Sequence, residues 1–211
     1  TQEALKLRKL FEYIGDLFAL HIEVVITDGS QPIGNGIGPA LEARDVQQVL
    51  SNKKEAPADL REKSLRLAGR ILEFDPDVRG GQGYVIARDI LESGRAFDKM
   101  QAIILAQGKQ QEKECSVPLK YAVTAQNNGY IHSIDNLKVA KIASLAGAPI
   151  DKFAGIYLSK KVGDQVIKGD TLFTIYACFK SEFEFAKQLT DEGAVYTIKA
   201  EPPVNNDNYF I

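Results

Sequence analysis

Asp28-Gly-Ser-Gln-Pro-Ile-Gly-Asn-Gly-Ile-Gly-Pro-Ala-Leu-Glu-Ala-Arg-Asp45 is the stretch that decides the fold. Four glycines and two prolines fall within eleven residues of it, between an apolar run over residues 22–26 and a helical pattern that begins near Pro39. Glycine permits backbone conformations and close approaches that a Cβ atom forbids. A strand, a glycine-rich turn and a helix in this order are how α/β proteins present backbone N–H and C=O groups to a ligand. The stretch therefore predicts α/β structure around a turn that binds a ligand or ion, with a tightly packed turn without a ligand as the alternative.

The spacing of these glycines excludes two well-known phosphate-binding turns. Gly34-Asn-Gly36-Ile-Gly38 has the pattern GxGxG, which is not the dinucleotide pattern GxGxxG. No acidic residue ends a second strand about twenty positions later, where a dinucleotide ribose would need one. No GK[ST] follows either, so the turn is not a P-loop.

Three carboxylates lie in or beside the turn, namely Asp28, Glu42 and Asp45. Such groups can transfer protons, or bind a hard cation together with backbone carbonyls. Glu42 and Asp45 are three positions apart on one helix face, and from the sequence alone a solvated helix surface is the simpler interpretation of them.

Composition is that of an ordinary soluble globular protein, with 45% apolar residues, 26% charged residues and a net charge of −2. This charge predicts no nucleic-acid partner, and no apolar run approaches the ~20 residues of a membrane span, so no membrane partner is expected. The two cysteines, Cys115 and Cys178, form no CxxC motif and are predicted to be free thiols in the reducing cytoplasm. A helix that begins at once after Thr1, without Met or a leader, predicts a processed or truncated product.

The pattern of apolar residues changes near residue 110, which predicts two domains, over residues 1–110 and 117–211, joined by the polar linker 109–118. The first domain is expected to be mainly helical, and the second to be mainly strand. The expected helices cover residues 1–20, 39–50, 59–74, 84–93, 95–107, 137–146 and 181–189. The expected strands cover residues 22–27, 120–126, 129–134, 154–158, 171–176 and 195–199. An Asn127-Asn128-Gly129 turn signal separates two of these strands, as in a β-hairpin.

A second motif, Gly-Asp-x-Val-x-x-Gly, covers residues 163–169. It is typical of tight turns in barrel-sandwich domains such as biotinyl and lipoyl carriers, where a lysine on a separate hairpin carries the cofactor. The nearest lysine after the motif is Lys180, in a Cys-Phe-Lys-Ser context unlike a biotinylation hairpin. A structural turn is therefore the favoured interpretation, and a carrier is the alternative.

Three ordered blocks resemble the thymidine/pyrimidine-nucleoside phosphorylase family and span nearly the whole chain. The first is residues 27–45, similar to a strand followed by the family's QPxG and GxALEA pattern. The second is residues 95–108, similar to the family's helix that ends in AQGG. The third comprises residues 129–135, 146–156 and 161–172, similar to the C-terminal domain. The residues of the turn, Gln31-Pro-Ile-Gly34 and Gly38–Asp45, most resemble the branch that holds archaeal AMP phosphorylases and related bacterial thymidine phosphorylases.

The resemblance implies a fold and an activity. Residues 1–110 would be a remnant of the α/β catalytic domain, and 117–211 an α+β, α/β-hammerhead-like C-terminal domain. The intact enzyme, a pentosyltransferase, would convert thymidine and phosphate to thymine and 2-deoxyribose 1-phosphate. An AMP phosphorylase and a non-catalytic folded module are the alternatives.

The resemblance also implies which parts are elsewhere. The family's phosphate loop and its base-binding Arg, Ser and Lys precede the region that matches this chain, so no catalytic or substrate-binding residue is assigned here. The chain is expected to be inactive alone and to need the missing N-terminal part, within a family homodimer. The family's monovalent cation, K⁺, would be bound by the main-chain carbonyls of Ile33 and Gly36 and by the carboxylate of Asp45, where relatives have Glu.

Overall fold

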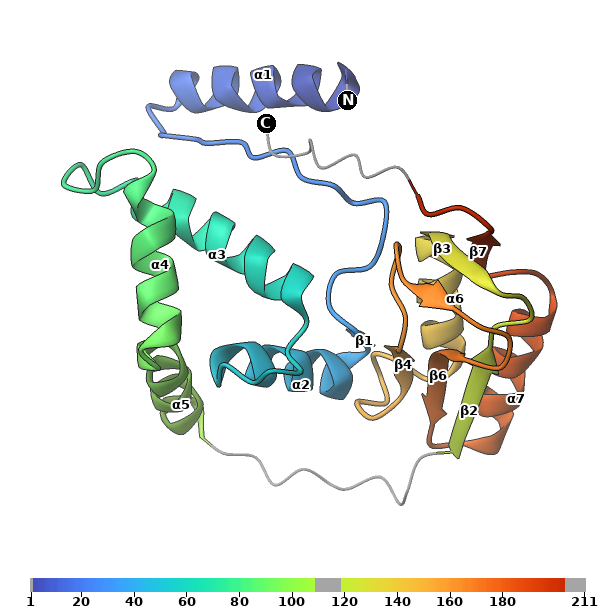
Figure 1. Ribbon diagram of the computed structural model, residues 1–211. Coiled ribbons are helices and arrows are strands. Elements are labelled where there is room, and N and C mark those ends of the chain that lie inside the picture. The colour runs from blue at the N-terminus through green and yellow to red at the C-terminus, as the bar shows by residue number, and fades with distance from the viewer. Residues whose placement is uncertain (1, 109–118, 204–211) are drawn as a thin grey trace.

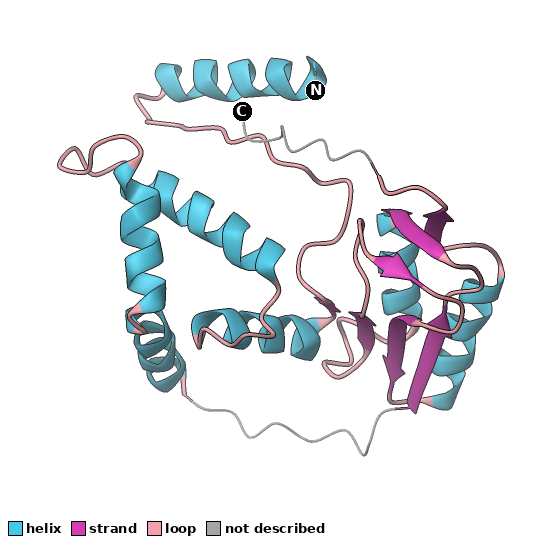
Figure 2. Cartoon of the chain, in the orientation of Figure 1, coloured by secondary structure: helices cyan, strands magenta, loops and turns pink. Residues whose placement is uncertain are grey.

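The computed structural model describes residues 2–108 and 119–203, so the predicted linker 109–118 lies outside the described residues. The chain forms a helical first region and an α+β second region (Figures 1 and 2). The first region holds five helices within its described residues: α1 (Gln2–Leu17), α2 (Pro39–Leu50), α3 (Ala58–Leu72), α4 (Gln82–Glu92) and α5 (Arg95–Gln107). All five were predicted, with ends that differ by no more than three residues.

Helices α2 to α4 share a small apolar core. Val49, Leu65, Ala87 and Leu91 are buried in it. Helix α2 starts with Pro39 in its first turn, where the missing N–H costs no hydrogen bond. Helix α1 lies apart from the other helices (Figure 1) and buries only Gly15.

The segment 22–27 is not the buried strand that the sequence predicted. It runs as an extended, half-buried chain, with a single β-bridge at Thr27. An apolar run becomes a strand only where a second strand satisfies its N–H and C=O groups. Within the described residues no such partner lies along this segment.

Within residues 119–203 the second region consists of two antiparallel sheets and two helices. Strand β1 (Gly36–Ile37), although it belongs to the first region by sequence, forms the edge of the larger sheet, whose order among the described residues is β1-β4-β6-β2. The smaller sheet has the order β5-β3-β7. The bounds are β2 (Leu119–Thr124), β3 (Gly129–Ile134), β4 (Gly155–Leu158), β5 (Gln165–Val166), β6 (Thr171–Ala177), β7 (Tyr196–Lys199), α6 (Asn136–Leu145) and α7 (Lys180–Asp191).

Strands β2 and β3 do not form the hairpin that the Asn-Asn-Gly signal predicted. The chain after β2 bonds instead to the turn before β6, since Ala125 N–H donates to Asp170 O at 2.8 Å and Gly169 N–H donates to Ala125 O at 2.9 Å. The side chain of Asn128 accepts from Lys168 N–H at 2.7 Å. The turn after β2 is therefore hydrogen-bonded to the turn before β6, and β2 and β3 belong to different sheets.

A large apolar core fills the space between these sheets and helices. Phe173, Ile131, Ile156 and Ile175 are fully buried in it. Cys178, which follows β6, is disulfide-bonded, so the prediction of a free thiol is wrong for this residue. No helix in the described parts of the chain combines the length and apolarity that a membrane span requires.

Candidate functional site: the glycine-rich turn

The glycine-rich turn leads from the extended segment into β1 and α2, at the junction of the two regions (Figure 1). Strand β1 pairs antiparallel with β4, and Gly36 lies opposite Tyr157. Leu158 N–H donates to Asn35 O at 2.7 Å. The turn is thus attached to the sheet of the second region, which no sequence signal had predicted.

Two glycines in the turn are required by close backbone contacts. A Cβ atom on Gly36 would lie 2.5 Å from the carbonyl carbon and oxygen of Leu41. Gly38 has a φ of +125° and lies against the carbonyl of Ala154. Only glycine combines this backbone angle with this proximity. The packed turn that was the alternative interpretation is therefore present, whether or not it also binds a ligand.

Asp45 is the buried charged side chain of the site, with 1% of its surface exposed. Its Oδ2 accepts from the N–H groups of Asn35 and Gly36, both at 2.6 Å. Its Oδ1 is buried and has no hydrogen-bond partner among the described residues. A buried carboxylate oxygen without a partner costs free energy, so this atom is suited to a cation.

The structure brings two of the predicted cation ligands together. Because Leu158 N–H bonds to Asn35 O, the next pair, Gly36 and Tyr157, is non-hydrogen-bonded, so the N–H and C=O groups of Gly36 face away from β4. The N–H group meets Asp45, so the carbonyl lies on the same side as this carboxylate.

The third predicted ligand, Ile33, is placed by its neighbour. Gly34 N–H, in the same peptide unit as the Ile33 carbonyl, donates to Asp59 Oδ2 at 3.2 Å. In a planar trans peptide the two groups point in opposite directions, so the Ile33 carbonyl points away from Asp59.

The other two carboxylates named by the sequence serve the backbone. Asp28 accepts from the N–H and the hydroxyl of Ser30, at 2.8 and 3.0 Å. Glu42 accepts from Gly38 N–H at 3.1 Å, at the start of α2. Asp59 was missed because it lies 25 positions from Gly34, in the first turn of a helix that carries no motif.

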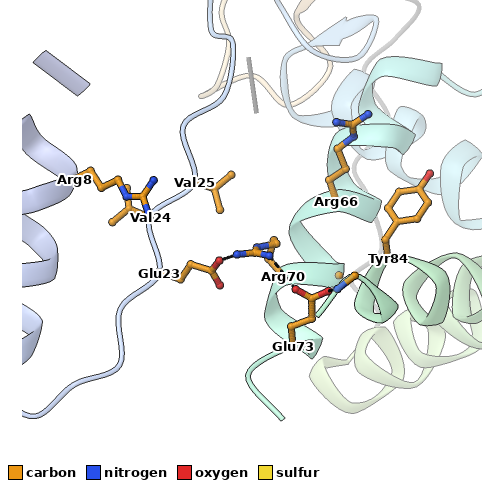
Figure 3. A pocket seen from close by; sticks show the side chains of 10 residues that line it. Arg8, Glu23, Val24, Val25, Arg66, Arg70, Glu73 and Tyr84 are labelled. Atoms are coloured by element: carbon orange, nitrogen blue, oxygen red, sulfur yellow. Dashed lines mark hydrogen bonds and ion pairs between the residues drawn. The ribbon is translucent and has the colours of Figure 1, made fainter. Parts of the chain in front are cut away.

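A separate cavity of about 430 Å³ lies between α1, the extended segment and helices α3 and α4, and Figure 3 shows the side chains that line it. Its arginines suggest an anion site, but each has an acidic partner. Arg70 pairs with Glu23 and Glu73, and Arg66 pairs with Glu62 at 2.6 Å. The third, Arg8, is 2.7 Å from Glu12. The cavity therefore offers no surplus positive charge for phosphate.

Glu62 and Tyr84 share a hydrogen bond of 2.8 Å at the edge of this cavity. The hydrogen bond from Arg66, with that from Tyr84, lowers the pKa of Glu62 against the opposing effect of burial. The same bond to Glu62 is the main cause that raises the pKa of Tyr84. Both groups keep their ordinary charge near neutral pH, and neither has the features of a catalytic acid or base.

Neither a clustered metal centre nor a carrier lysine is present among the described residues. The described part of the chain holds no group of three or more His, Cys, Asp and Glu side chains arranged to bind a metal. Lys180 is the first residue of α7 and does not lie at a hairpin tip, so the structure gives no support to a carrier.

Comparison with known proteins identifies the family. Residues 130–197 match the family model of the pyrimidine nucleoside phosphorylase C-terminal domain. A protein of Methylococcus capsulatus, with the name "Putative thymidine phosphorylase", is 58% identical over 197 residues, or 93% of this chain. The chain belongs to the thymidine/pyrimidine-nucleoside phosphorylase family. This is a family of pentosyltransferases, and the resemblance seen in the sequence is thereby confirmed.

Other phosphorylases of the family match in the same way. Proteins with the same name from two strains of Rhodopseudomonas palustris are 53% identical over 93% of this chain (strain BisA53) and 51% identical over 98% of it (strain CGA009). The chain spans only 38–40% of the length of these three relatives. The family model covers most of the second region, from β3 into β7, and does not include the glycine-rich turn.

Proposed function

We propose that this chain is part of a thymidine phosphorylase, which transfers the 2-deoxyribosyl group of thymidine to phosphate. An oxygen of phosphate attacks the anomeric carbon as the bond to thymine breaks, so that thymine and 2-deoxyribose 1-phosphate result. The observation that carries the proposal is the 58% sequence identity, over 93% of this chain, to the Methylococcus capsulatus protein whose name states this activity. The glycine-rich turn with its buried carboxylate is the part of that match with a site-like structure.

The groups that contact phosphate and base are proposed to lie outside this chain. Helix α1 exposes Leu10 and Leu17 to 52% and 64%, and Phe18, directly after the helix, is 71% exposed. The extended segment 22–27 has backbone groups suited to a neighbouring strand. A chain that spans 38% of its relative is expected to be covered here by part of the remaining polypeptide. The chain alone is therefore proposed to be inactive.

The glycine-rich turn is proposed to contribute to a K⁺ site of the complete enzyme. Asp45 Oδ1 and the Gly36 carbonyl lie on one side of the turn, and the Ile33 carbonyl completes this chain's ligands. Carboxylate and carbonyl oxygens are the ligands that hard cations prefer. A bound K⁺ would neutralise the buried carboxylate. The chain's own contribution is to hold Asp45 in place through the N–H groups of Asn35 and Gly36.

A phosphorolysis assay tests the proposed activity. The chain alone is expected to release no thymine from thymidine. The same chain, joined to the segments of the Methylococcus capsulatus relative that lie outside the matched region, is expected to release thymine only when phosphate is present. The relative's segments without this chain are the control. Thymine release by the 211-residue chain alone would overturn the proposal that the reacting groups lie elsewhere.

The same assay separates the family alternative. With AMP in place of thymidine, an AMP phosphorylase would release adenine and ribose 1,5-bisphosphate. Preference for AMP over thymidine in the joined protein would replace the proposed substrate. No release from either nucleotide or nucleoside would favour the non-catalytic module.

The family homodimer and the cytoplasmic location remain proposals as well. Light scattering of the joined protein is expected to give the mass of two chains. The disulfide of Cys178 is unusual for a reducing compartment. Cell fractionation therefore tests the location, and recovery of the protein outside the cytoplasmic fraction would overturn it.

A further inference from the structure

Lys161 connects the second region to the glycine-rich turn. It lies in the loop between β4 and β5, and its Nζ donates to Pro32 O at 2.7 Å and to Gly34 O at 2.5 Å. The same ammonium group lies 3.0 Å from Asp59 Oδ2, at the start of α3. Only 22% of the Lys161 side chain is exposed. One charged group therefore binds two carbonyls of the turn and one carboxylate of the neighbouring helix.

The loop that carries Lys161 is itself firmly held. The backbone N–H of Lys161 donates to Asp164 Oδ2 at 2.8 Å, and Gly163 N–H donates to Ile131 O, also at 2.8 Å. Tyr196 donates its hydroxyl proton to Lys160 O at 3.0 Å. Burial, with the nearby Asp164, raises the pKa of Tyr196 and keeps this donor protonated. The ammonium group is thus presented from a fixed point in the second region.

Lys161 and Asp45 bind opposite sides of the same backbone. Asn35 N–H points at Asp45, so the Gly34 carbonyl in the same peptide unit points the other way, to Lys161. The peptide unit that joins Ile33 to Gly34 lies between the two units whose carbonyls Lys161 binds. Its N–H group, that of Gly34, donates to Asp59. Three charged side chains therefore fix each peptide plane around the carbonyl of Ile33.

We propose that Lys161 is a positioning residue for the cation site, and that its ammonium group serves as a permanently attached monovalent cation on one face of the glycine-rich turn. An ammonium group resembles K⁺ in size and in its preference for carbonyl oxygens. With Pro32 O and Gly34 O bound to Lys161, the opposite face, with Gly36 and Asp45, is held ready for an exchangeable cation. The inference rests on the proposed cation site, and it requires no nucleoside or phosphate.

Hydrogen exchange of the turn tests this role in the 211-residue chain. Lys161→Ala and Lys161→Met should speed exchange of the N–H groups of Gly34, Asn35 and Gly36 by at least about tenfold, since a hydrogen bond to a charged group is lost. Lys160→Met is the matched control, because the Lys160 ammonium binds Gln165 O and Asp170 and does not bind the turn. Unchanged exchange of Phe173 and Ile175 in β6 would show that each variant is folded.

Chemical rescue distinguishes an attached cation from simple packing. In Lys161→Ala, methylammonium chloride should slow exchange of the turn in a saturable way, and sodium chloride at the same ionic strength should not. Exchange that stays at the wild-type rate in Lys161→Met, or that methylammonium fails to slow in Lys161→Ala, would overturn the role of Lys161.

A K⁺ titration keeps the two hypotheses apart. In the complete, joined protein K⁺ should slow exchange of the turn, and Asp45→Asn should abolish this effect. If K⁺ has no effect there while the Lys161 variants and their rescue behave as expected, the proposed cation site fails, and with it the positioning role of Lys161, whereas its role as an attached cation on the turn stands. If the joined protein shows no phosphorolysis while hydrogen exchange of the turn behaves as expected, only the proposed reaction fails.

Discussion

The two regions of this chain bury their apolar residues to very different extents. In the second region Phe173, Ile131 and Ile175 are fully buried between two sheets and two helices. Among the described residues of the first region the buried core is formed by four residues, and Leu17 at the end of α1 and Phe18 just after it are 64% and 71% exposed. The second region thus has a core of the kind found in self-contained domains, whereas the first leaves an apolar surface, which we proposed above to be covered by the remaining polypeptide. The glycine-rich turn joins them, because its strand β1 belongs to the sheet of the second region.

Phe173→Ala should have the largest effect. Phe173 is fully buried and stacks on Tyr196 at a centroid distance of 5.8 Å. Truncation removes these contacts and leaves a cavity, so we expect the free energy of unfolding of the second region to fall by about 3–5 kcal/mol. Urea unfolding measures this loss. Phe173→Leu is the control and should cost less, and a loss below about 1 kcal/mol in Phe173→Ala would contradict the idea of a self-contained domain.

Gly36→Ala tests the junction between the regions. The added Cβ atom would collide with the main chain at Leu41, which cannot rotate away as a side chain can. We expect a loss of about 1–3 kcal/mol, together with faster exchange of the Leu158 N–H that bonds to the turn. Gly29→Ala is the matched control, since nothing lies within 4 Å of its Cβ position. Equal stability of the two variants would mean that β1 is not tightly held.

The sequence predicts where helices and strands form better than it predicts which strands pair. The helix α5 and the strand β3 have the predicted bounds, because each combines a regular apolar pattern with a glycine at its start. The pairing of β2 with β6, and of β1 with β4, depends on residues far apart in the chain, which apolar periodicity does not report. The apolar run at 22–27 has the pattern of a strand, but pattern alone does not provide a neighbouring strand.

The candidate site shows the same limit. Asp45 was named first as one of three carboxylates beside the turn and then as a cation ligand that the family resemblance implies. The solvated helix surface that the sequence alone favoured is wrong for Asp45, because its carboxylate is buried and bound to two backbone N–H groups. Asp59 and Lys161 were missed, because they are ordinary surface residues in the sequence and reach the turn only through the fold. Long-range contacts of charged side chains with main-chain groups leave no local signature.

Apolar residues of α1 should tolerate polar substitution in this chain. Leu10 and Leu17 are 52% and 64% exposed, so the double variant Leu10→Ser, Leu17→Ser should change the free energy of unfolding by less than about 0.5 kcal/mol. The same variant should impair the joined, complete protein, where this face is proposed to be covered. Leu91→Ala, at a position buried in the small core, is the control and should cost about 2–5 kcal/mol. A large loss from the α1 variant in the chain alone would show that α1 is already packed.

The smallest expected effect concerns pH and the first region. The hydrogen bond from Arg66, with that from Tyr84, lowers the pKa of Glu62 in the folded chain. A folded-state pKa below the unfolded one means that the charged form favours folding, so this stabilisation is present above the unfolded pKa and is lost as pH falls through the folded pKa. Glu62 is 41% exposed, and an exposed i,i+4 pair contributes only about 0.3–0.5 kcal/mol. Glu62→Gln should therefore be slightly less stable than the wild type at neutral pH and equally stable in acid.

Because Glu62 lies in the helices and not in the second region, the difference should appear in hydrogen exchange of α3 and α4 while β6 is unaffected. A pH-dependent change in β6 would show that the two regions unfold as one unit, and would remove the contrast between them.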